Sequence, residues 1–168
     1  MGLMKVFASV LALAASSVAD AQAPSGLKPA KVGEVVAATH ACLRATQADR
    51  VDEALLRADR WETATFSANG KAVDTPLRIY GRKTGHAMIM VVGKGELRKM
   101  CTVMARVPQV GDLREAGTAL ATSLGKRPAQ VKDGGATWFV EDKLINLQAT
   151  GSREKPSLRV SVMVVAKN

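Results

Sequence analysis

Two cysteines and two histidines are the residues whose side chains could carry nucleophilic chemistry. They are Cys42, Cys101, His40 and His86. A cysteine nucleophile needs an imidazole within hydrogen-bond reach and a third group that orients the ring. His40 and Cys42 are two residues apart, so their side chains diverge on a helix. His86 could meet Cys101 or Asp74 only through the fold, and a hydrolase assembled around His86 is therefore the alternative function.

The favoured interpretation of the two cysteines is a structural disulfide. Cys42 shares the apolar face of an expected helix with Val35 and Leu43, and Cys101 lies in an alternating strand pattern. A bridge between them would pin the first helix to the sheet. It would close a loop of about 60 residues and stabilise the fold by about 4 kcal/mol in the chain-entropy model. The sequence contains neither C-x-x-C nor C-x-x-C-H, so thioredoxin-like and covalent haem motifs are absent.

The sequence carries no motif for a cofactor or a metal. A P-loop, a G-x-G-x-x-G fingerprint, a G-x-S-x-G elbow and an H-E-x-x-H zinc motif are all missing. Glu141 and Asp142 are adjacent but fall in an expected hairpin turn. Strand methionines such as Met88, Met90 and Met104 could form a copper site, but we interpret them as core residues. The expected cofactors and metals are none, and a non-enzymatic protein is favoured.

The basic balance is the one global sign of a partner. Lys plus Arg number 24 against 15 Asp plus Glu, which gives a net charge of +9. The candidate binding residues are six cations that flank one hairpin: Arg78, Arg82, Lys83, Lys94, Arg98 and Lys99. Such a surface would attract an anionic envelope component or an acidic envelope protein, although it could equally serve only solubility. Aromatic residues make up 4% of the chain, which argues against nucleic acid.

The N-terminus predicts export. Lys5 precedes an apolar stretch over 6–15 that is too short to span a bilayer, and small residues follow it. We expect a signal peptide over 1–21, cut after Ala21, and a periplasmic or secreted protein without a transmembrane segment in the mature chain. A retained N-terminal anchor is the other interpretation. Cleavage removes one lysine and one aspartate, so the mature chain of about 147 residues keeps its net charge of +9.

Three helices are expected. Residues 22–30 are expected to be a flexible segment, and 31–47 form an amphipathic helix with Thr39 on its apolar stripe. A short helix begins after the N-cap Asp52, and Val51 and Leu56 are spaced as a hydrophobic staple. A third helix begins at Asp112 as N-cap with Glu115 as its capping-box partner, and Gly125 ends it.

The remaining patterns predict strands joined by short turns. A strand follows Trp61 and turns at Asn69-Gly70; further strands cover 77–79, 87–92 and 96–107. The continuous apolar run 87–92 predicts a strand that is covered on both faces or lies at the centre of a sheet. After the third helix come strands over 136–140, 144–150 and 158–166.

The element order is therefore α-α-β-β-β-β-α-β-β-β. It predicts the α+β class, with helices packed on one face of an antiparallel sheet. We expect one domain over 31–168. Its halves over about 31–107 and 110–168 each have a helix followed by a strand that carries a tryptophan, which could indicate an internal repeat, although any two α+β halves could agree this far by chance. The expected function is an exported, soluble, non-enzymatic envelope protein that binds a protein or an anionic partner through a basic surface or a sheet face.

Overall fold

The structure, a computed structural model, describes residues 28–65, 67–68, 71–72 and 75–165. The expected signal peptide and the turn at Asn69-Gly70 lie outside these residues. Ala30 is the first buried residue of the described part of the chain, and it donates its backbone N–H to the carbonyl of Arg106 at 2.8 Å. The helices are α1 (Val32–Ala45), α2 (Glu53–Ala58), the 3₁₀ helix η1 (Glu96–Lys99) and α3 (Gly111–Leu124).

The strands are β1 (Glu62–Thr63), β2 (Ser67–Ala68), β3 (Lys71–Ala72), β4 (Leu77–Gly81), β5 (Met88–Val92), β6 (Met100–Arg106), β7 (Gln130–Lys132), β8 (Gly135–Val140), β9 (Lys143–Gly151) and β10 (Pro156–Val164). Eight of them form one sheet in the order β1-β4-β5-β6-β10-β9-β8-β7, and every pair in it is antiparallel. The α+β class is confirmed.

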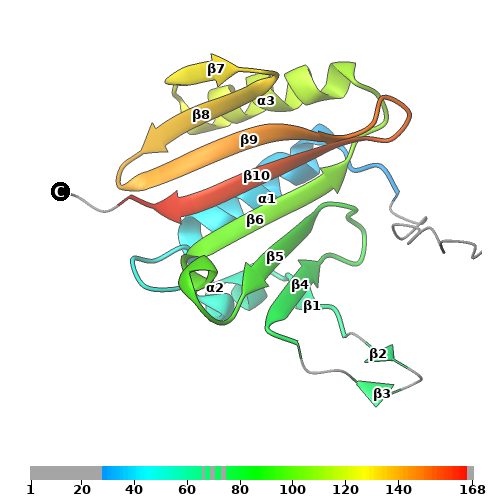
Figure 1. Cartoon of the computed structure of the whole chain (residues 1–168), viewed down its shortest axis with the longest axis vertical. Helices are drawn as coiled ribbons and strands as arrows, with labels where there is room; N and C mark the ends of the chain where they lie inside the picture. The colour runs from blue at the N-terminus through cyan, green and yellow to red at the C-terminus, as the bar shows by residue number, and fades with distance from the viewer. Residues whose placement is uncertain (1–27, 66, 69–70, 73–74, 166–168) are drawn as a thin grey trace, which may run out of the picture.

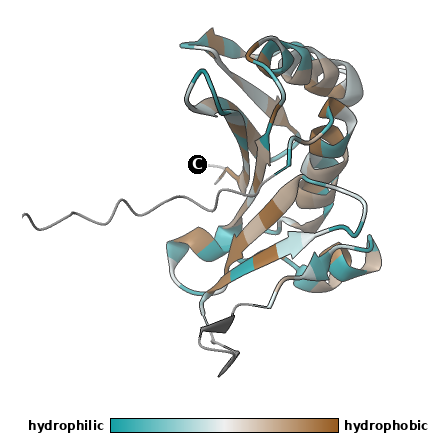
Figure 2. Ribbon diagram, turned by 90° about the vertical axis from the view of Figure 1, so that its right-hand side faces the viewer, coloured by the Kyte–Doolittle hydropathy of each residue, from teal (hydrophilic) through white to brown (hydrophobic). Residues whose placement is uncertain are grey.

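Both long helices lie on the same side of the sheet. Figures 1 and 2 show α1 and α3 against one face, while no α-helix of the described residues covers the opposite face. An antiparallel sheet commonly buries one face and leaves the other to solvent. We call this uncovered surface the open face. Its side chains differ from those that pack against the helices.

The sheet is built from two three-stranded units that meet at its centre. The first unit is β4-β5-β6 and the second is β8-β9-β10, each preceded by one long helix. Their last strands, β6 and β10, pair over seven residues from Arg106–Ser157 to Met100–Met163. This order places equivalent strands symmetrically about the centre, as two similar halves would require. That the halves are a true repeat stays a prediction.

The core lies between the helices and the sheet. Its largest side chains include Trp138, Tyr80, Ile89 and Leu158, all nearly inaccessible to solvent. Helix α1 faces them with small residues, which allow the helix to approach the strands closely; the buried residues of α1 are Val35, Ala38, Thr39, Ala41, Cys42 and Ala45.

The helix ends follow local side-chain chemistry. Asp52 caps α2 as predicted, because its carboxylate accepts from the backbone N–H of Ala54 at 3.0 Å. The predicted cap of α3 is displaced: the helix begins at Gly111, and Asp112 lies in its first turn. There the carboxylate of Asp112 accepts from the backbone N–H of Gln109 at 3.2 Å, the role usually taken by the N3 residue of a capping box. Gly125 ends α3 with a φ of 62°.

Two strand predictions need correction. Residues 96–107 are not one strand, because Glu96–Lys99 first form the turn of η1, and β6 begins only at Met100. Strand β7 was not predicted, because its three residues are exposed and lack an alternating apolar pattern. No described helix combines the length and apolar character needed to cross a membrane.

Candidate binding surfaces

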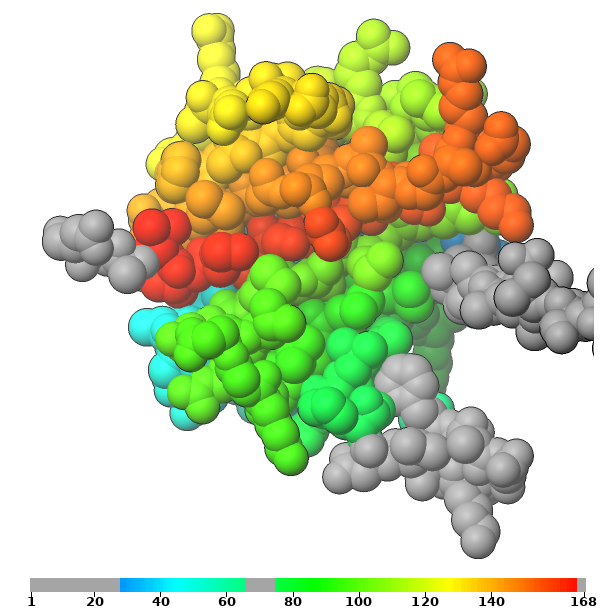
Figure 3. All heavy atoms as spheres, viewed as in Figure 1, coloured from blue at the N-terminus to red at the C-terminus, as the bar shows by residue number. Residues whose placement is uncertain are grey.

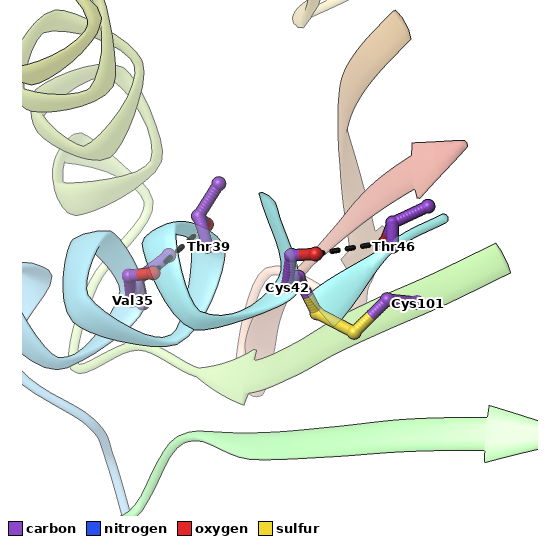
Figure 4. Close-up of a disulfide and its surroundings, with 5 residues drawn as sticks. All are labelled: Val35, Thr39, Cys42, Thr46 and Cys101. Atoms are coloured by element: carbon purple, nitrogen blue, oxygen red, sulfur yellow. Dashed lines mark hydrogen bonds between the residues drawn. A yellow bond between two sulfur atoms is a disulfide. The ribbon is translucent and has the colours of Figure 1, made fainter. Parts of the chain in front are cut away.

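Cys42 and Cys101 form a disulfide between α1 and β6, as predicted (Figure 4). Both residues are fully buried, and the Sγ atoms lie 1.97 Å apart. The threonines beside the bridge are also buried, and their hydroxyls donate within the helix: Thr39 to the carbonyl of Val35 at 2.9 Å and Thr46 to that of Cys42 at 2.8 Å. This bonding explains how Thr39 fits into an apolar stripe.

Among the described residues, those proposed for a hydrolase do not form a nucleophile–base pair. Cys101 is part of the disulfide and so cannot supply a thiolate, and Asp74 lies outside the described residues. His86 is half-buried, and it is its backbone N–H that donates to the carboxylate of Glu34, at 2.6 Å. The same carboxylate accepts from the N–H of Ala87 at 3.3 Å. Glu34 therefore ties α1 to the segment that enters β5.

The predicted basic residues are largely engaged with the protein's own acceptors. Arg78 pairs with Glu53 at 3.0 Å, Lys83 with Glu62 at 3.6 Å and Lys99 with Glu96 at 3.2 Å. Arg82 donates to the carbonyl of Asp59 at 2.8 Å, and its guanidinium lies 4.6 Å from the ring centre of Trp61. Internal pairing lowers the charge that these side chains can offer to a partner.

The six cations also do not form one patch. Arg82 and Lys83 lie in the connection between β4 and β5, whereas Lys94 and Arg98 lie in the connection between β5 and β6. These connections are at opposite ends of β5. The sequence placed all six around one hairpin, but the strand direction separates them into two groups.

A polar cluster that sequence analysis missed joins α2 to β4. The carboxylate of Glu53 accepts hydrogen bonds from the hydroxyl of Tyr80 and from the guanidinium of Arg78. Burial raises the pKa of Tyr80, and the hydrogen bond to Glu53 raises it further. The residues are 25 and 27 positions apart in the chain, so no local spacing connects them. These hydrogen bonds hold α2 against β4. Because the carboxylate of Glu53 already accepts both of them, it is less available to bind a ligand.

The methionines lie on the open face, and the prediction that they fill the core is wrong. Ile89 and Val91 point to the helices and are buried, while Met88 and Met90 between them are half-buried on the other side. Met100, Met104 and Met163 share that side, because they are cross-strand partners in register with it. Strand β5 is thus apolar on both faces although only one face is covered. The sequence feature that indicates this apolar outer face is methionine at alternate positions of the strand, where a solvent-facing side normally carries polar residues.

Polar and cationic residues continue the open face toward β8. Met104 is opposite Arg159, which is opposite Gln148 and donates a hydrogen bond to its amide oxygen. Beside them the amide of Asn146 donates to Thr137 at 2.9 Å. The open-face residues of the six strands β4, β5, β6, β10, β9 and β8 are Leu77, Ile79, Gly81, Met88, Met90, Val92, Met100, Thr102, Met104, Arg106, Ser157, Arg159, Ser161, Met163, Leu144, Asn146, Gln148, Thr150, Gly135, Thr137 and Phe139.

None of those residues is an aspartate or a glutamate. The side chains of β6, β10 and β9 form a broad surface across the middle of the molecule in Figure 3, which is viewed from this side. Toward β7 the surface is hollowed by a polar depression of about 360 Å³, whose walls include Gln130, Lys132, Asn146 and Gln148. Asp133, in the turn after β7, also lines that depression.

An apolar groove lies on the other side of the sheet, between α3 and strands β7, β8 and β9. Its volume is about 700 Å³, and its walls include Leu113, Gly117 and Ala121 from the helix and Val131 and Trp138 from the strands. No predicted site residue lines it. The described residues contain no group of three His, Cys, Asp or Glu side chains able to hold a metal ion.

Comparison with known proteins gives no relative from which a role could be transferred: no protein-family model, no curated protein and no solved structure matches this chain.

Proposed function

We propose that the chain is an exported, non-enzymatic binding protein of the cell envelope, and that its open face binds an acidic segment of another polypeptide. The observation that carries the proposal is the composition of the open face. It combines methionine side chains with arginine, serine, threonine and amide groups, and its six strands present no carboxylate there. Export rests on the N-terminal sequence, and the buried disulfide suits an oxidising compartment.

Methionine is well suited to a surface that is buried only in a complex. Its unbranched thioether side chain adapts to irregular partners and is frequent at binding surfaces that accept varied sequences. A strand face that only meets water would be expected to carry polar residues. Here five methionines lie on one such face instead: Met88, Met90, Met100, Met104 and Met163.

The charge of the open face also favours an acidic partner. Arg159 lies on the open face next to the methionines, and its cross-strand neighbours are uncharged. An approaching carboxylate would therefore meet a cation without a repelling acid on the surrounding strands. The hairpin cations Arg78, Lys83 and Lys99 are weaker candidates, because each is already paired with a glutamate.

Site-specific photocrosslinking in cells tests the proposal. A photoreactive amino acid at Ser161, in the middle of the open face, should capture one or more proteins rich in acidic residues. The same group at Thr122, an exposed position on α3, is the matched control and should not capture them. The Arg159→Glu variant should bind the purified partner about tenfold more weakly, because a like charge replaces an attractive one.

Arg127→Glu is the control for the change in net charge. Arg127 is exposed in the loop after α3, away from the open face, so this variant should keep the affinity of the natural chain. Equal capture from Ser161 and Thr122, or equal weakening by Arg127→Glu and Arg159→Glu, would contradict docking on the open face. A circular dichroism melt of each variant checks that the fold is intact.

A further inference from the structure

The groove beside α3 exists because the helix covers its part of the sheet incompletely. Helix α1 buries six residues, whereas the buried residues of α3 are Ala116 and Leu120. Val131 on β7 is paired with Ala136, whose cross-strand partner Leu147 is buried beneath α3, yet Val131 is 70% exposed. Val110 at the start of α3 is 51% exposed. Two valines therefore border an apolar hollow rather than packing against each other.

Glycine keeps the hollow open. Gly117 lies in the middle of α3 and lines the groove, and a Cβ placed there would meet only the side chain of Leu147, at 3.5 Å. That distance is an ordinary van der Waals contact, so alanine would fit without strain. Glycine in a helix interior costs about 1 kcal/mol relative to alanine. The chain thus carries a destabilising residue at the position where a larger side chain would fill the groove.

The lining is apolar with a single charge. Its polar side chains are Thr118 and Arg114, and none of its residues is an aspartate or a glutamate. The indole N–H of Trp138 is buried without an acceptor among the described residues. The volume of about 700 Å³ is in the range of small-molecule sites, which are mostly apolar with a few polar groups that orient the ligand.

We propose that this groove binds the acyl chain of a free fatty acid, with the carboxylate at Arg114. An acyl chain has no hydrogen-bonding groups, which matches a wall of alanine, valine, leucine and tryptophan side chains. A peptide would bring one N–H and one C=O for each residue, and these walls offer few side chains that could satisfy them. The single cation and the lack of acids select an anionic head group. This ligand site is separate from the open face and does not depend on the proposed function.

Calorimetry on the purified mature protein tests the site, with laurate below its micelle concentration as the probe. The natural chain should bind laurate with one ligand per chain. The Gly117→Leu variant should lose at least tenfold in affinity, because the new side chain occupies the groove. The Gly117→Ala variant is the matched control and should keep affinity within about twofold. Both substitutions raise helix propensity, so loss of fold is not the expected cause.

The contact between the ligand's carboxylate and Arg114 is tested by changing the ligand's head group and by replacing Arg114. Arg114→Gln should weaken laurate binding about threefold to fivefold, as expected for an exposed ion pair, and should leave dodecanol binding unchanged. Tighter binding of dodecyl phosphate than of laurate would overturn the assignment to a fatty acid and indicate a phospholipid. No binding of laurate, or equal binding by Gly117→Leu and Gly117→Ala, would overturn the site. A dimer of the natural chain that Gly117→Leu dissociates would show that the groove is instead an interface between copies.

Discussion

At the scale of single residues, one partly buried hydrogen bond joins two segments that no local sequence pattern connects. Tyr80 is the only tyrosine of the chain, and its hydroxyl donates to Glu53 across the junction of α2 and β4. A buried hydroxyl that lost this acceptor would be costly. The same carboxylate holds Arg78, so one glutamate connects a helix to the edge region of the sheet.

The raised pKa of Tyr80 predicts how stability depends on pH. The fold favours the protonated phenol, so this contribution is fully present below the usual tyrosine pKa of about 10 and is lost as pH rises through the higher pKa of the folded state. Tyr80→Phe should lower the free energy of unfolding by about 1–3 kcal/mol at pH 7, and the difference from the natural chain should shrink above pH 10. Urea unfolding at several pH values measures both effects.

The absorbance of the phenolate measures the pKa of Tyr80 directly, because the chain has no other tyrosine. Titration of the folded protein should show a pKa above that of the unfolded chain, and Glu53→Gln should move it back toward the unfolded value. The hydrogen-bond acceptor is kept in that variant while the charge is removed. A folded Tyr80 that titrates like the unfolded one would contradict this account.

At the scale of elements, the disulfide joins the first helix to the centre of the sheet. Cys42 is in α1, and Cys101 is in β6, the strand that pairs with β10 between the two halves. The bridge closes a loop between residues 59 positions apart. Most of the first half of the described chain lies within that loop, so the bridge restricts the unfolded state more than a short loop would.

Removal of the bridge should therefore weaken the fold strongly. The double variant Cys42→Ala/Cys101→Ala should lose about 4 kcal/mol of unfolding free energy, measured in urea, because its unfolded chain is no longer restricted by the cross-link. Non-reducing mass spectrometry should find the natural chain two hydrogens lighter than its dithiol form. Because both cysteines are buried, a reductant should open the bridge readily only when denaturant is present. Free thiols in exported protein, or a loss below about 1 kcal/mol, would refute this role.

Element packing also explains why the strand methionines are not part of the buried core. An apolar run such as 87–92 predicts burial but does not say how many layers cover the sheet. The chain has only two long helices in its described part, and both lie on one side. The alternate residues of β5 and β6 therefore face outward, and the apolar character that resembles a core lies on the open face.

At the scale of the whole molecule, charge and compartment act together. Removal of the expected leader would leave the net charge of +9 unchanged, since residues 1–21 contain one lysine and one aspartate. Many of the cations predicted to form a patch are paired with neighbouring acids. The excess charge is thus a general field that salt screens, and the partner proposed for the open face would be selected by that surface rather than by the net charge.

The expected signal peptide predicts where the processed chain begins. Protein recovered from the envelope should begin at Gln22, because small residues at Ala19 and Ala21 suit signal peptidase. Ala21→Leu should block processing and leave the precursor, whereas the control Ala23→Leu should be processed normally. N-terminal sequencing or mass spectrometry distinguishes these products. A natural chain that starts at Met1 would show that the leader is retained.

The sequence by itself determined the α+β class, the order of most elements, the N-cap Asp52 and the pairing of the two cysteines. These features depend on periodicity, on short-range hydrogen bonds and on there being only two thiols, all of which are local or countable properties. The sequence could not place β7, whose three exposed residues lack a pattern, or the Tyr80–Glu53 bond, whose partners are far apart in the chain.

Only the tertiary structure decided which face of each strand is covered. Alternation fixes that Met90 and Val91 point to opposite sides, but the position of α1 and α3 determines that Val91 is buried and Met90 lies on the open face. The same helices leave the groove at Gly117, because α3 does not cover the edge of the sheet. Both candidate binding surfaces are thus products of layer packing, which acts between segments distant in the sequence and leaves no local signature.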